Sequence, residues 1–550
     1  MIIIDYKMSR RAVILSCPWR KIGYAETYDD PFTLLIIPKE LLEKNKLIPG
    51  SSFRYICSDR KNIKNVPSCY LDRNYMAMVT TCEDIKQPLK VPILVGILFL
   101  SGKYIYGANK KGMIKYIFQP ENNNYPRYIV ASRLGRGGID YYVRVEPQPW
   151  VDVEIPSANC IENIGEIDKC DYNEIIAEKY FLRLKPKPAY SLPDITFMPL
   201  YYGTLFSIDP VNCRDIDDVI GWKRTDEYTE VSIHIAHVTA VPHPEFVINQ
   251  TVTIYPPDKP NYNLLPNKIA EDGLSLVPGK RRNVLSLLLR WDNKNGFSQT
   301  VREHSIINER ALTYDEAEID MEYLIVKEWV EKKLFNEVLV DSHAFIEKLM
   351  IYTNSYIAER LTEVCSNDAI LRVTSGNMER SPALYMLNSD CIIQKRSSRH
   401  IHLSKEYYTH FTSPLRRAVD QDVHNLVRKY ILNDLSVKDL DLCKRRYRLR
   451  KYNMRLEHVR FAETEWFWLQ KYNEGIVNFE ALVINIQQEN ILELLILEYD
   501  KRITILYNNT KTLEAADLPE CLWKTGDKCI IKLLWDKTLG LRGKRFYLEQ

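Results

Sequence analysis

The sequence Asp209-Pro-Val-Asn-Cys-Arg-Asp215-Ile-Asp217-Asp218 places four carboxylates within ten residues. Carboxylates this close repel one another unless a cation neutralises them, and clustered oxygen ligands select Mg²⁺ or Mn²⁺ over softer metals. Pro210 and Asn212 favour a turn that folds Asp209 back toward Asp215. In an extended chain Asp215 and Asp217 share one face, and Asp218 can then complete a second site. The stretch therefore predicts a site for divalent cations, of the type that enzymes use to hydrolyse phosphodiester bonds.

The alternative interpretation of this stretch is a solvated acidic turn. The residues on either side, Leu205-Phe-Ser-Ile and Val219-Ile-Gly-Trp, are largely apolar and typical of strands. Apolar, strand-like flanks of this kind weaken the alternative of a solvated turn.

A second group of chemically active residues is His410-Phe-Thr-Ser-Pro-Leu-Arg416-Arg417, followed at helical spacing by Asp420 and His424. We expect a helix to begin at Pro414, with Thr412 or Ser413 as its cap, so that backbone N–H groups and two arginines converge. Such a cluster binds phosphate, since arginine offers a planar fork that is always charged. An ordinary helix start is the alternative.

The length and composition of the chain limit the number of domains and the class of protein. The chain has 550 residues, and domains of about 150 residues predict three to four of them. Hydrophobic residues at 45% and charged residues at 27% indicate a folded protein. The longest apolar run, Pro92 to Leu100, is about half of what a membrane span needs. Charged residues interrupt the first 15 positions where a secretory signal needs an apolar core, so we expect an intracellular, cytoplasmic protein without a membrane span.

The twelve cysteines include no C-x-x-C pair, which argues against a zinc ribbon and against a disulfide framework. The net charge of +3 is too small to indicate nucleic-acid binding by itself. One segment is strongly basic: Lys444 to Arg460 has eight Lys or Arg against the single acid Glu457. We interpret it either as a helix that contacts phosphates or as a solvated helix face.

Short strands with tight turns are predicted at both ends of the chain. Residues 10–85 and 95–131 read as such strands, and residues 479–550 return to them, so each stretch is a candidate for a small β-barrel. Between them, a proline-rich linker at Lys185–Pro188 leads into a large mixed α and β body. Its strands are expected at 230–237 and 252–255, and its helices at 314–335, 342–365, 414–432 and 439–472.

Aromatic residues in the second stretch suggest a surface for stacking bases: Tyr104, Tyr106, Tyr116 and Phe118. The alternative is that these side chains belong to the core.

Taken together, the acidic run and the His-Phe-Thr-Ser-Pro-Leu-Arg-Arg segment resemble the two signature segments of the RNB-domain exoribonucleases. This is the family of ribonuclease II, ribonuclease R and the catalytic subunit of the exosome. Further segments are similar in the same order: Val231-Ser-Ile-His-Ile-Ala-His237-Val, Tyr255-Pro-Pro, and Glu271-Asp-Gly-Leu-Ser-Leu-Val-Pro-Gly.

The resemblance implies a multidomain fold in which a mixed α/β RNB catalytic domain is flanked by small OB-fold β-barrels. On this basis residues 89–195 form a cold-shock-like barrel with a linker, residues 196–475 the RNB domain, and residues 476–550 an S1-type barrel. Residues 1–88 are assigned to an earlier barrel of the same type.

The implied activity is that of a Mg²⁺-dependent 3′-to-5′ exoribonuclease, with Mn²⁺ as an alternative cofactor, that hydrolyses single-stranded RNA to nucleoside 5′-monophosphates. Its metal ligands would be Asp209, Asp215, Asp217 and Asp218. Asp217, Asp218 and Arg416 would be catalytic, and Tyr255, Arg416 and Arg417 would bind the substrate. We expect single-stranded RNA as the partner of a monomer, and no membrane. The alternative functions are a catalytically silent RNB fold that binds RNA or a partner, and a metal nuclease that cuts internally or acts on DNA.

Some positions depart from the family pattern. His237 stands where the family has an aspartate, and Lys348 replaces the second acid of the family's glutamate pair, next to Glu347. Glu457 is a candidate for a further glutamate near the site. The stretches 313–342 and 365–399 are shorter than in the family, and we identify no second stacking aromatic in them.

Overall fold

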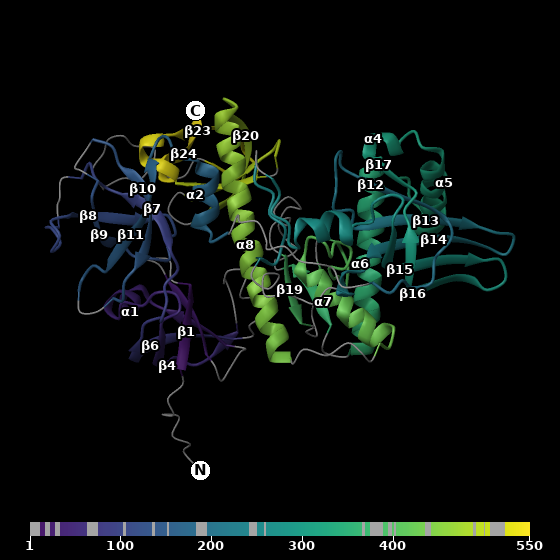
Figure 1. The fold of residues 1–550 in the computed structure, drawn as a ribbon, viewed down its shortest axis with the longest axis horizontal. Helices are drawn as coiled ribbons and strands as arrows, with labels where there is room; N and C mark the ends of the chain where they lie inside the picture. The colour runs from purple at the N-terminus through teal and green to yellow at the C-terminus, as the bar shows by residue number, and fades with distance from the viewer. Residues whose placement is uncertain are drawn as a thin grey trace, which may run out of the picture. The chain divides into compact units, whose positions relative to one another are not determined.

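The computed structural model describes residues 11–549 with gaps. The gaps are residues 17–21, 28–32, 63–74, 103–105, 135–137, 151–152, 183–194, 241–249, 258–259, 366–368, 375–388, 394–398, 401–402, 435–441, 488–490, 500 and 507–522. The linker expected at 185–188 therefore lies outside the described residues. Contacts divide the chain into two units, one made of Met1–Arg183 with His458–Gln550 and the other of Leu184–Glu457 (Figure 1). The four-domain division remains a prediction.

The first unit begins with a closed arrangement of short strands. They are β1 (Arg11–Ser16), β2 (Gly23–Thr27), β3 (Thr33–Ile37), β4 (Ser52–Cys57), β5 (Lys61–Asn62) and β6 (Tyr75–Lys86), with helix α1 (Lys39–Lys44) after β3. The strand order is β3-β2-β1-β4-β6-β5, and an additional parallel pairing of β3 with β6 closes the sheet. Leu35, Phe53 and Val79 fill its core together with Leu42 of α1. This is the earlier OB-like barrel expected near the beginning of the chain.

A second, closed barrel follows in the order β10-β11-β9-β8-β7. Its strands are β7 (Leu94–Leu98), β8 (Ile114–Pro120), β9 (Tyr128–Ser132), β10 (Tyr141–Pro147) and β11 (Ser157–Glu166), and helix α2 (Tyr172–Lys179) follows. Tyr116 and Phe118 are buried in the barrel core. The predicted stacking surface is therefore wrong for these two residues, because both lie on the inward-facing side of β8. Tyr106 is exposed, and Tyr104 lies outside the described residues.

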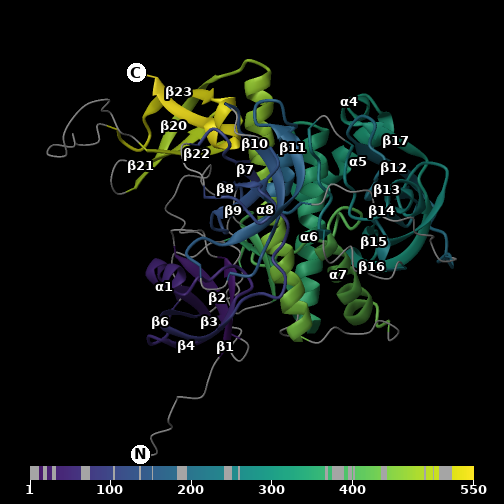
Figure 2. The same ribbon diagram turned by 60° about the vertical axis from the view of Figure 1, so that its left-hand side comes forward.

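The third sheet of this unit comes from the end of the chain. Its order is β22-β21-β20-β23-β24, from β20 (Asn478–Gln487), β21 (Ile491–Ile496), β22 (Lys501–Leu506), β23 (Lys528–Trp535) and β24 (Lys544–Glu549). Figures 1 and 2 both show it beside the β7–β11 barrel. The backbone N–H of Leu541 donates to the Tyr142 hydroxyl at 3.0 Å, and that hydroxyl donates to Glu121 Oε1 at 2.8 Å. Gly540, at φ +62°, allows this contact because a Cβ there would lie 2.3 Å from the Tyr142 oxygen.

The second unit is built on a six-stranded sheet in the order β16-β15-β14-β13-β12-β17. Its strands are β12 (Thr204–Asp209), β13 (Asp218–Arg224), β14 (Tyr228–Ala236), β15 (Arg281–Asp292), β16 (Gly296–Ile307) and β17 (Arg310–Thr313). Neighbours are antiparallel except β12 and β17, which pair in parallel. β14 is buried along almost its whole length. A mixed α/β body with OB-like barrels is thus confirmed as the fold class.

Helices complete the second unit, and the last of them continues into the first unit. They are α4 (Tyr314–Ala317), α5 (Met321–Val330), α6 (Ser342–Cys365), α7 (Ala418–Leu426) and α8 (Leu442–Asn473). The structure places α6 at the range predicted for it. It contradicts the strand expected at 252–255, where Val252 and Ile254 instead form isolated bridges to Arg417 and Tyr262.

The helix expected to begin at Pro414 begins four residues later, at Ala418. Residues 414–416 form a turn in which the N–H of Arg417 donates to Ser413 O at 3.1 Å. Arg417 is extended, at φ −134° and ψ 120°, because it pairs with Val252. The correction matters for function, since Asp420 and Asp217 bind the N–H groups of Ser413 and Leu415, which therefore do not face out from a helix end.

In the part of the chain that the structure describes, no helix is long and apolar enough to cross a membrane. Cys213 and Cys529, which lie in that part of the chain, are free thiols.

We predict that Gly221→Ala destabilises the protein. Gly221 lies in the middle of β13, where a Cβ would be 2.1 Å from Ser232 Oγ and 2.9 Å from His234 Nε2 of the neighbouring strand. His234 cannot move aside easily, because its other ring nitrogen is 2.8 Å from Ser286 Oγ. Overpacking of this kind costs about 1–3 kcal/mol. Chemical denaturation should show the loss. The control Gly138→Ala meets nothing within 4 Å and should leave the midpoint unchanged, and equal midpoints for both variants would contradict the packing described.

Candidate active site

A cavity of about 960 Å³ lies in the second unit. Every residue that the sequence assigned to catalysis, metal binding or substrate binding lines it: Asp209, Asp215, Asp217, Asp218, Tyr255, Arg416 and Arg417. These residues come from three segments that are far apart in the sequence. The fold therefore brings the two signature segments together around one space.

The acidic loop connects β12 to β13 and follows the turn predicted for it. The N–H of Cys213 donates to Pro210 O at 3.0 Å, and Asn212 has a φ of +63°. The loop is also anchored from outside, because the N–H of Ile216 donates to Ser275 Oγ at 2.9 Å and the Ser275 hydroxyl donates to Arg214 O at 2.7 Å. The carboxylates are thus carried by a loop whose backbone is fixed at both ends and in the middle.

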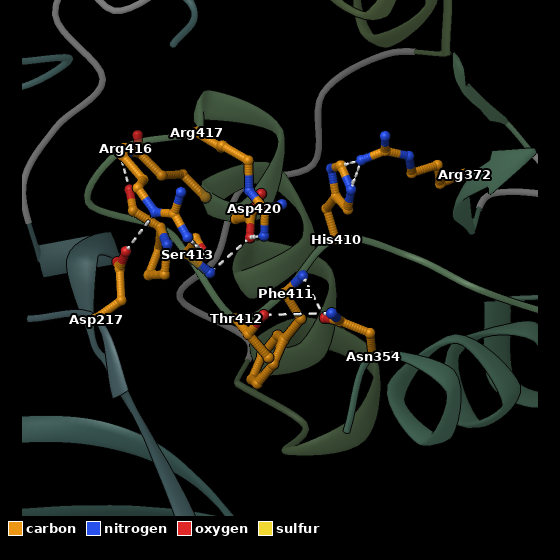
Figure 3. A network of polar contacts seen from close by, with 12 residues as sticks. Asp217, Asn354, Arg372, His410, Phe411, Thr412, Ser413, Arg416, Arg417 and Asp420 are labelled. Carbon is orange, nitrogen blue, oxygen red and sulfur yellow. Dashed lines mark hydrogen bonds and ion pairs between the residues drawn. The ribbon is translucent and has the colours of Figure 1, made fainter. Parts of the chain in front are cut away.

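Asp217 joins the acidic loop to the arginine segment (Figure 3). Its Oδ1 accepts a hydrogen bond from the backbone N–H of Leu415 at 2.8 Å, and its Oδ2 accepts one from Arg416 Nε at 3.2 Å. Asp217 is almost completely buried, whereas the Arg416 side chain is about half exposed. The guanidinium is therefore held at Nε by the protein, and the side chain lines the cavity.

Asp420 fixes the other half of the arginine segment. Its Oδ1 accepts from the N–H of Ser413 at 2.8 Å and from Arg417 Nη2 at 2.7 Å (Figure 3). Arg416 Nη2 in turn donates to Ser413 Oγ at 3.1 Å. Two buried carboxylates, one from each signature segment, thus hold the turn at residues 413–417. The charge-assisted bonds orient both arginines.

Tyr255 and Arg416 are placed beside each other by backbone pairing. The N–H of Thr253 donates to Arg416 O at 2.9 Å, and the N–H of Ala418 donates to Thr251 O at 2.8 Å. The Tyr255 ring lies in the cavity wall and remains partly exposed. Burial and the nearby Asp215 raise the pKa of its hydroxyl, so the side chain stays neutral.

Burial is the main cause of a raised pKa at all four carboxylates. Burial raises the pKa of Asp209 to about 6 and that of Asp217 to about 7. Burial and then the neighbouring Asp209 and Asp217 raise the pKa of Asp218, and burial raises that of Asp215. The charge of Arg416 opposes each of these shifts without cancelling them.

These residues suit a divalent cation in their chemistry. The donors are hard carboxylate oxygens, which Mg²⁺ and Mn²⁺ prefer. Asp209 Oδ2 is buried and has no hydrogen-bond partner, so an acceptor is left without a positive group. In the part of the chain described, no three His, Cys, Asp or Glu side chains are grouped so that they could hold an ion as they stand. An ion would therefore have to draw the carboxylates closer together.

Three further residues of the cavity wall were not assigned a role from the sequence. Tyr314 stacks on His343 with ring centroids 3.6 Å apart, and Arg372 of β18 (Ile370–Thr374) contacts the ring of His410 (Figure 3). His410 was quoted within its motif but given no function. Tyr314 and Arg372 lie in stretches without a chemical motif, and only their position in the fold brings them to the site.

The other residues singled out in the sequence do not all line the cavity. Glu347 lines the cavity, whereas Lys348 pairs with Glu337 and Glu457 does not contribute to the lining. His237 lies 3.2 Å from Glu303, which also binds Arg428 at 3.2 Å, so this departure from the family supports a polar contact outside the cavity.

The basic run on α8 is partly built into the protein. Arg445 is buried, and Arg448 pairs with Asp422 of α7 at 2.8 Å. Neither interpretation from the sequence, a solvated face or a phosphate-binding helix, describes these two residues.

Comparison with known proteins identifies the domain around the cavity. Residues 199–333 match the family model of the RNB domain. The human exosome complex exonuclease RRP44 is 22% identical over 92% of this chain, and the chain spans 65% of the length of that relative.

Solved structures share the fold. RNase R of Mycoplasma genitalium, in a complex with ribose-methylated single-stranded RNA, superimposes with a TM-score of 0.66 at 14% identity, over 98% of this chain and all of that one. Yeast Ssd1, described as a pseudonuclease, gives 0.63 at 14% identity, over 90% of this chain and 78% of the other. The family match places an RNB domain at residues 199–333, and the relatives and the shared architecture agree with it.

Proposed function

We propose that this chain is a divalent-metal-dependent exoribonuclease that hydrolyses single-stranded RNA from its 3′ end and releases nucleoside 5′-monophosphates. The observation that carries the proposal is the meeting of Asp209, Asp215, Asp217 and Asp218 with Arg416 around one cavity. The names of the relatives support the same class, since RRP44 is an exonuclease and RNase R a ribonuclease. A volume of about 960 Å³ is at the upper end of small-molecule pockets, which suits the end of a single strand better than a duplex.

Asp209, Asp215, Asp217 and Asp218 would hold the cations. When bound, such ions supply positive charge against the scissile phosphate and make a water molecule a better nucleophile. The protein's own contribution is to hold the carboxylates on an anchored loop and to keep Arg416 directed at the position of the phosphate. Because the Nε edge of Arg416 is bound to Asp217, its terminal N–H groups can stabilise charge that develops on the phosphate oxygens.

Tyr255 would stack on the base of the terminal nucleotide. Its ring lies in the cavity wall, and its backbone segment is paired with that of Arg416, so base and phosphate would be positioned by adjoining segments. Stacking on an aromatic ring does not depend on base identity. This suits an enzyme that must accept every nucleotide in turn.

The competing function is RNA binding without hydrolysis, and the fold shared with the pseudonuclease Ssd1 gives it a specific basis. A protein of that kind does not need four ionisable carboxylates facing one cavity, because buried like charges destabilise the fold. Retention of all four together with Arg416 therefore favours catalysis.

We predict that Asp217→Asn abolishes RNA hydrolysis and leaves the dissociation constant for RNA within a few-fold. The amide oxygen can still accept from the Leu415 N–H, but the amide NH₂ cannot accept from Arg416 Nε, so the negative charge toward the metal and one anchor of Arg416 are both lost. Turnover and RNA binding should be measured separately, by a denaturing gel and by fluorescence anisotropy. Asp226→Asn, at an exposed turn, is the control. Unchanged turnover in Asp217→Asn would refute the site, and loss of binding as well would indicate a damaged fold.

Arg416→Ala should lower kcat far more than it raises KM. Removing one preorganised donor of this type typically costs about 10²–10³ in kcat, because the interaction is strongest in the transition state. Steady-state kinetics on a short RNA give both constants, with the exposed Arg302→Ala as the control. A change confined to KM would mean that Arg416 only binds the substrate.

Mg²⁺ should raise the thermal unfolding midpoint, and the effect should weaken as the pH falls from 8 to 5.5. Carboxylates bind the ion when they are ionised, and the pKa values of Asp209 and Asp217 are raised to about 6 and about 7. Protons therefore compete with the metal in this range. Saturation at a hundred times the dissociation constant is worth about 2.7 kcal/mol. Asp209→Asn should reduce the shift, and a shift that is independent of pH and of this variant would place the ion elsewhere.

A further inference from the structure

Large apolar side chains are exposed on and beside α5, away from the cavity residues. They are Ile319, Met321, Leu324, Ile325, Val338 and Val340. Three of them are almost fully accessible, with exposed fractions of 81% for Ile319, 82% for Val338 and 91% for Val340. Scattered single apolar residues are common on protein surfaces, whereas a contiguous group is not. We call this group the α5 face.

Hydrogen bonds show that the six residues form one surface. The N–H of Leu339 donates to Glu331 Oε1 at 2.7 Å, and Lys327 Nζ donates to Leu339 O at 2.9 Å. Further along, the N–H of Ser342 contacts Glu318. The segment 338–342 therefore runs alongside α5 in the opposite direction. Leu339 is buried, so Val338 and Val340 on either side of it point outward, next to the exposed residues of α5.

The core does not account for these side chains, because α5 already buries its other face. Tyr323, Val326 and Val330 are buried. Trp329 packs on the sheet, with ring centroids 5.7 Å from Trp222 and 6.0 Å from Trp291. Figure 1 shows α4 and α5 at the β12–β17 side of the sheet. The helix is thus anchored through one side, and its outer apolar side has no partner among the described residues.

The α5 face lies in a strongly acidic part of the chain. Residues 314–341 contain nine Asp or Glu and three Lys, a net charge of −6, whereas the whole chain carries +3. Arg310 pairs with Asp320 and Glu322, which leaves a clear acidic excess. Glu322, Glu328 and Glu337 are exposed around the apolar residues and pair with Arg310, Lys332 and Lys348. The acidic excess persists when these cations are counted, since residues 310–348 contain ten Asp or Glu and five Lys or Arg. An apolar centre with an acidic rim is complementary to a surface with an apolar centre and a basic rim.

The negative charge around the α5 face determines which kind of partner can bind there. RNA is excluded by repulsion from its phosphates. A second copy docking through the same face would bring two acidic rims together, which costs affinity. We propose that the α5 face binds a basic amphipathic helix of a partner protein. Two parallel rows of apolar residues, one on α5 and one on segment 338–340, match the stripe that such a helix presents at positions i, i+3, i+4 and i+7. This inference does not depend on nuclease activity.

The test uses the full chain and a synthetic peptide of about 18 residues built of Leu and Lys with a helical apolar stripe. Its counterpart of Leu and Glu has the same stripe and the opposite charge. Binding is measured by fluorescence anisotropy to the unaltered chain and to the double variant Ile325→Ser/Val340→Ser. The matched control is Leu89→Ser/Ile530→Ser, since Ile530 is as exposed as Ile325, at 47%, and lies in the other unit. All four positions are exposed, so folding should be unaffected, and thermal unfolding checks this.

The proposal expects the Leu/Lys peptide to bind, the Ile325→Ser/Val340→Ser variant to weaken binding at least tenfold, and the control variant to change it less than twofold. The Leu/Glu peptide should not bind. The proposal is overturned if the Leu/Lys peptide does not bind the unaltered chain, if both double variants bind it equally, or if the Leu/Glu peptide binds as well. A dimer in sedimentation equilibrium that the Ile325→Ser/Val340→Ser variant abolishes would also overturn it, because the occupant would then be a second copy.

Discussion

The hydrogen bonds that Asp217 accepts from Leu415 and Arg416 connect two parts of the chain that are almost 200 residues apart. Without this contact, the acidic loop between β12 and β13 and the turn at residues 413–417 would be two separate polar surfaces. With it, a carboxylate cluster and a guanidinium face the same cavity. The contact is also costly, because Asp217 is buried and its pKa is raised to about 7. This cost supports the catalytic role proposed for Asp217.

The surrounding structure holds this unfavourable arrangement in place. The six-stranded sheet fixes both ends of the acidic loop, and Ser275 fixes its middle. Asp420 fixes the turn at residues 413–417 by accepting a hydrogen bond from the Ser413 N–H. Each carboxylate that is close to another resists ionisation, and a divalent cation would relieve the whole group at once. Cation affinity and fold stability are consequently linked in this site.

Much of the site could be predicted from the sequence, because its chemistry is concentrated in two short motifs. The turn at Pro210–Asn212 follows from local preferences, and the meeting of the motifs follows from the family resemblance. The start of α7 could not be predicted in the same way. Pro414 permits a helix start, but pairing of Arg417 with Val252 and capture of the Ser413 N–H by Asp420 replace it with a turn. These are tertiary interactions, and local sequence preferences do not predict them.

Tertiary packing also explains the other predictions from sequence patterns that were wrong or incomplete. Alternation along β8 predicts a strand but does not say which face is buried, so Tyr116 and Phe118 were expected at a stacking surface and lie in the core. Tyr314 and Arg372 reach the cavity only through the packing of α4 and β18. The contact of Leu541 with Tyr142 of β10 joins residues that are 399 positions apart, and nothing local signals it.

The function proposed for the acidic loop and the turn at residues 413–417 is hydrolysis of RNA from its 3′ end. The most direct test is a time course on single-stranded RNA labelled at its 5′ end, with Mg²⁺ and with EDTA, resolved on a denaturing gel. We expect metal-dependent loss of full-length RNA into progressively shorter 5′-labelled fragments, together with release of nucleoside 5′-monophosphates. RNA that stays intact in Mg²⁺ while still shifting on a native gel would contradict it, since the cavity would then serve binding alone.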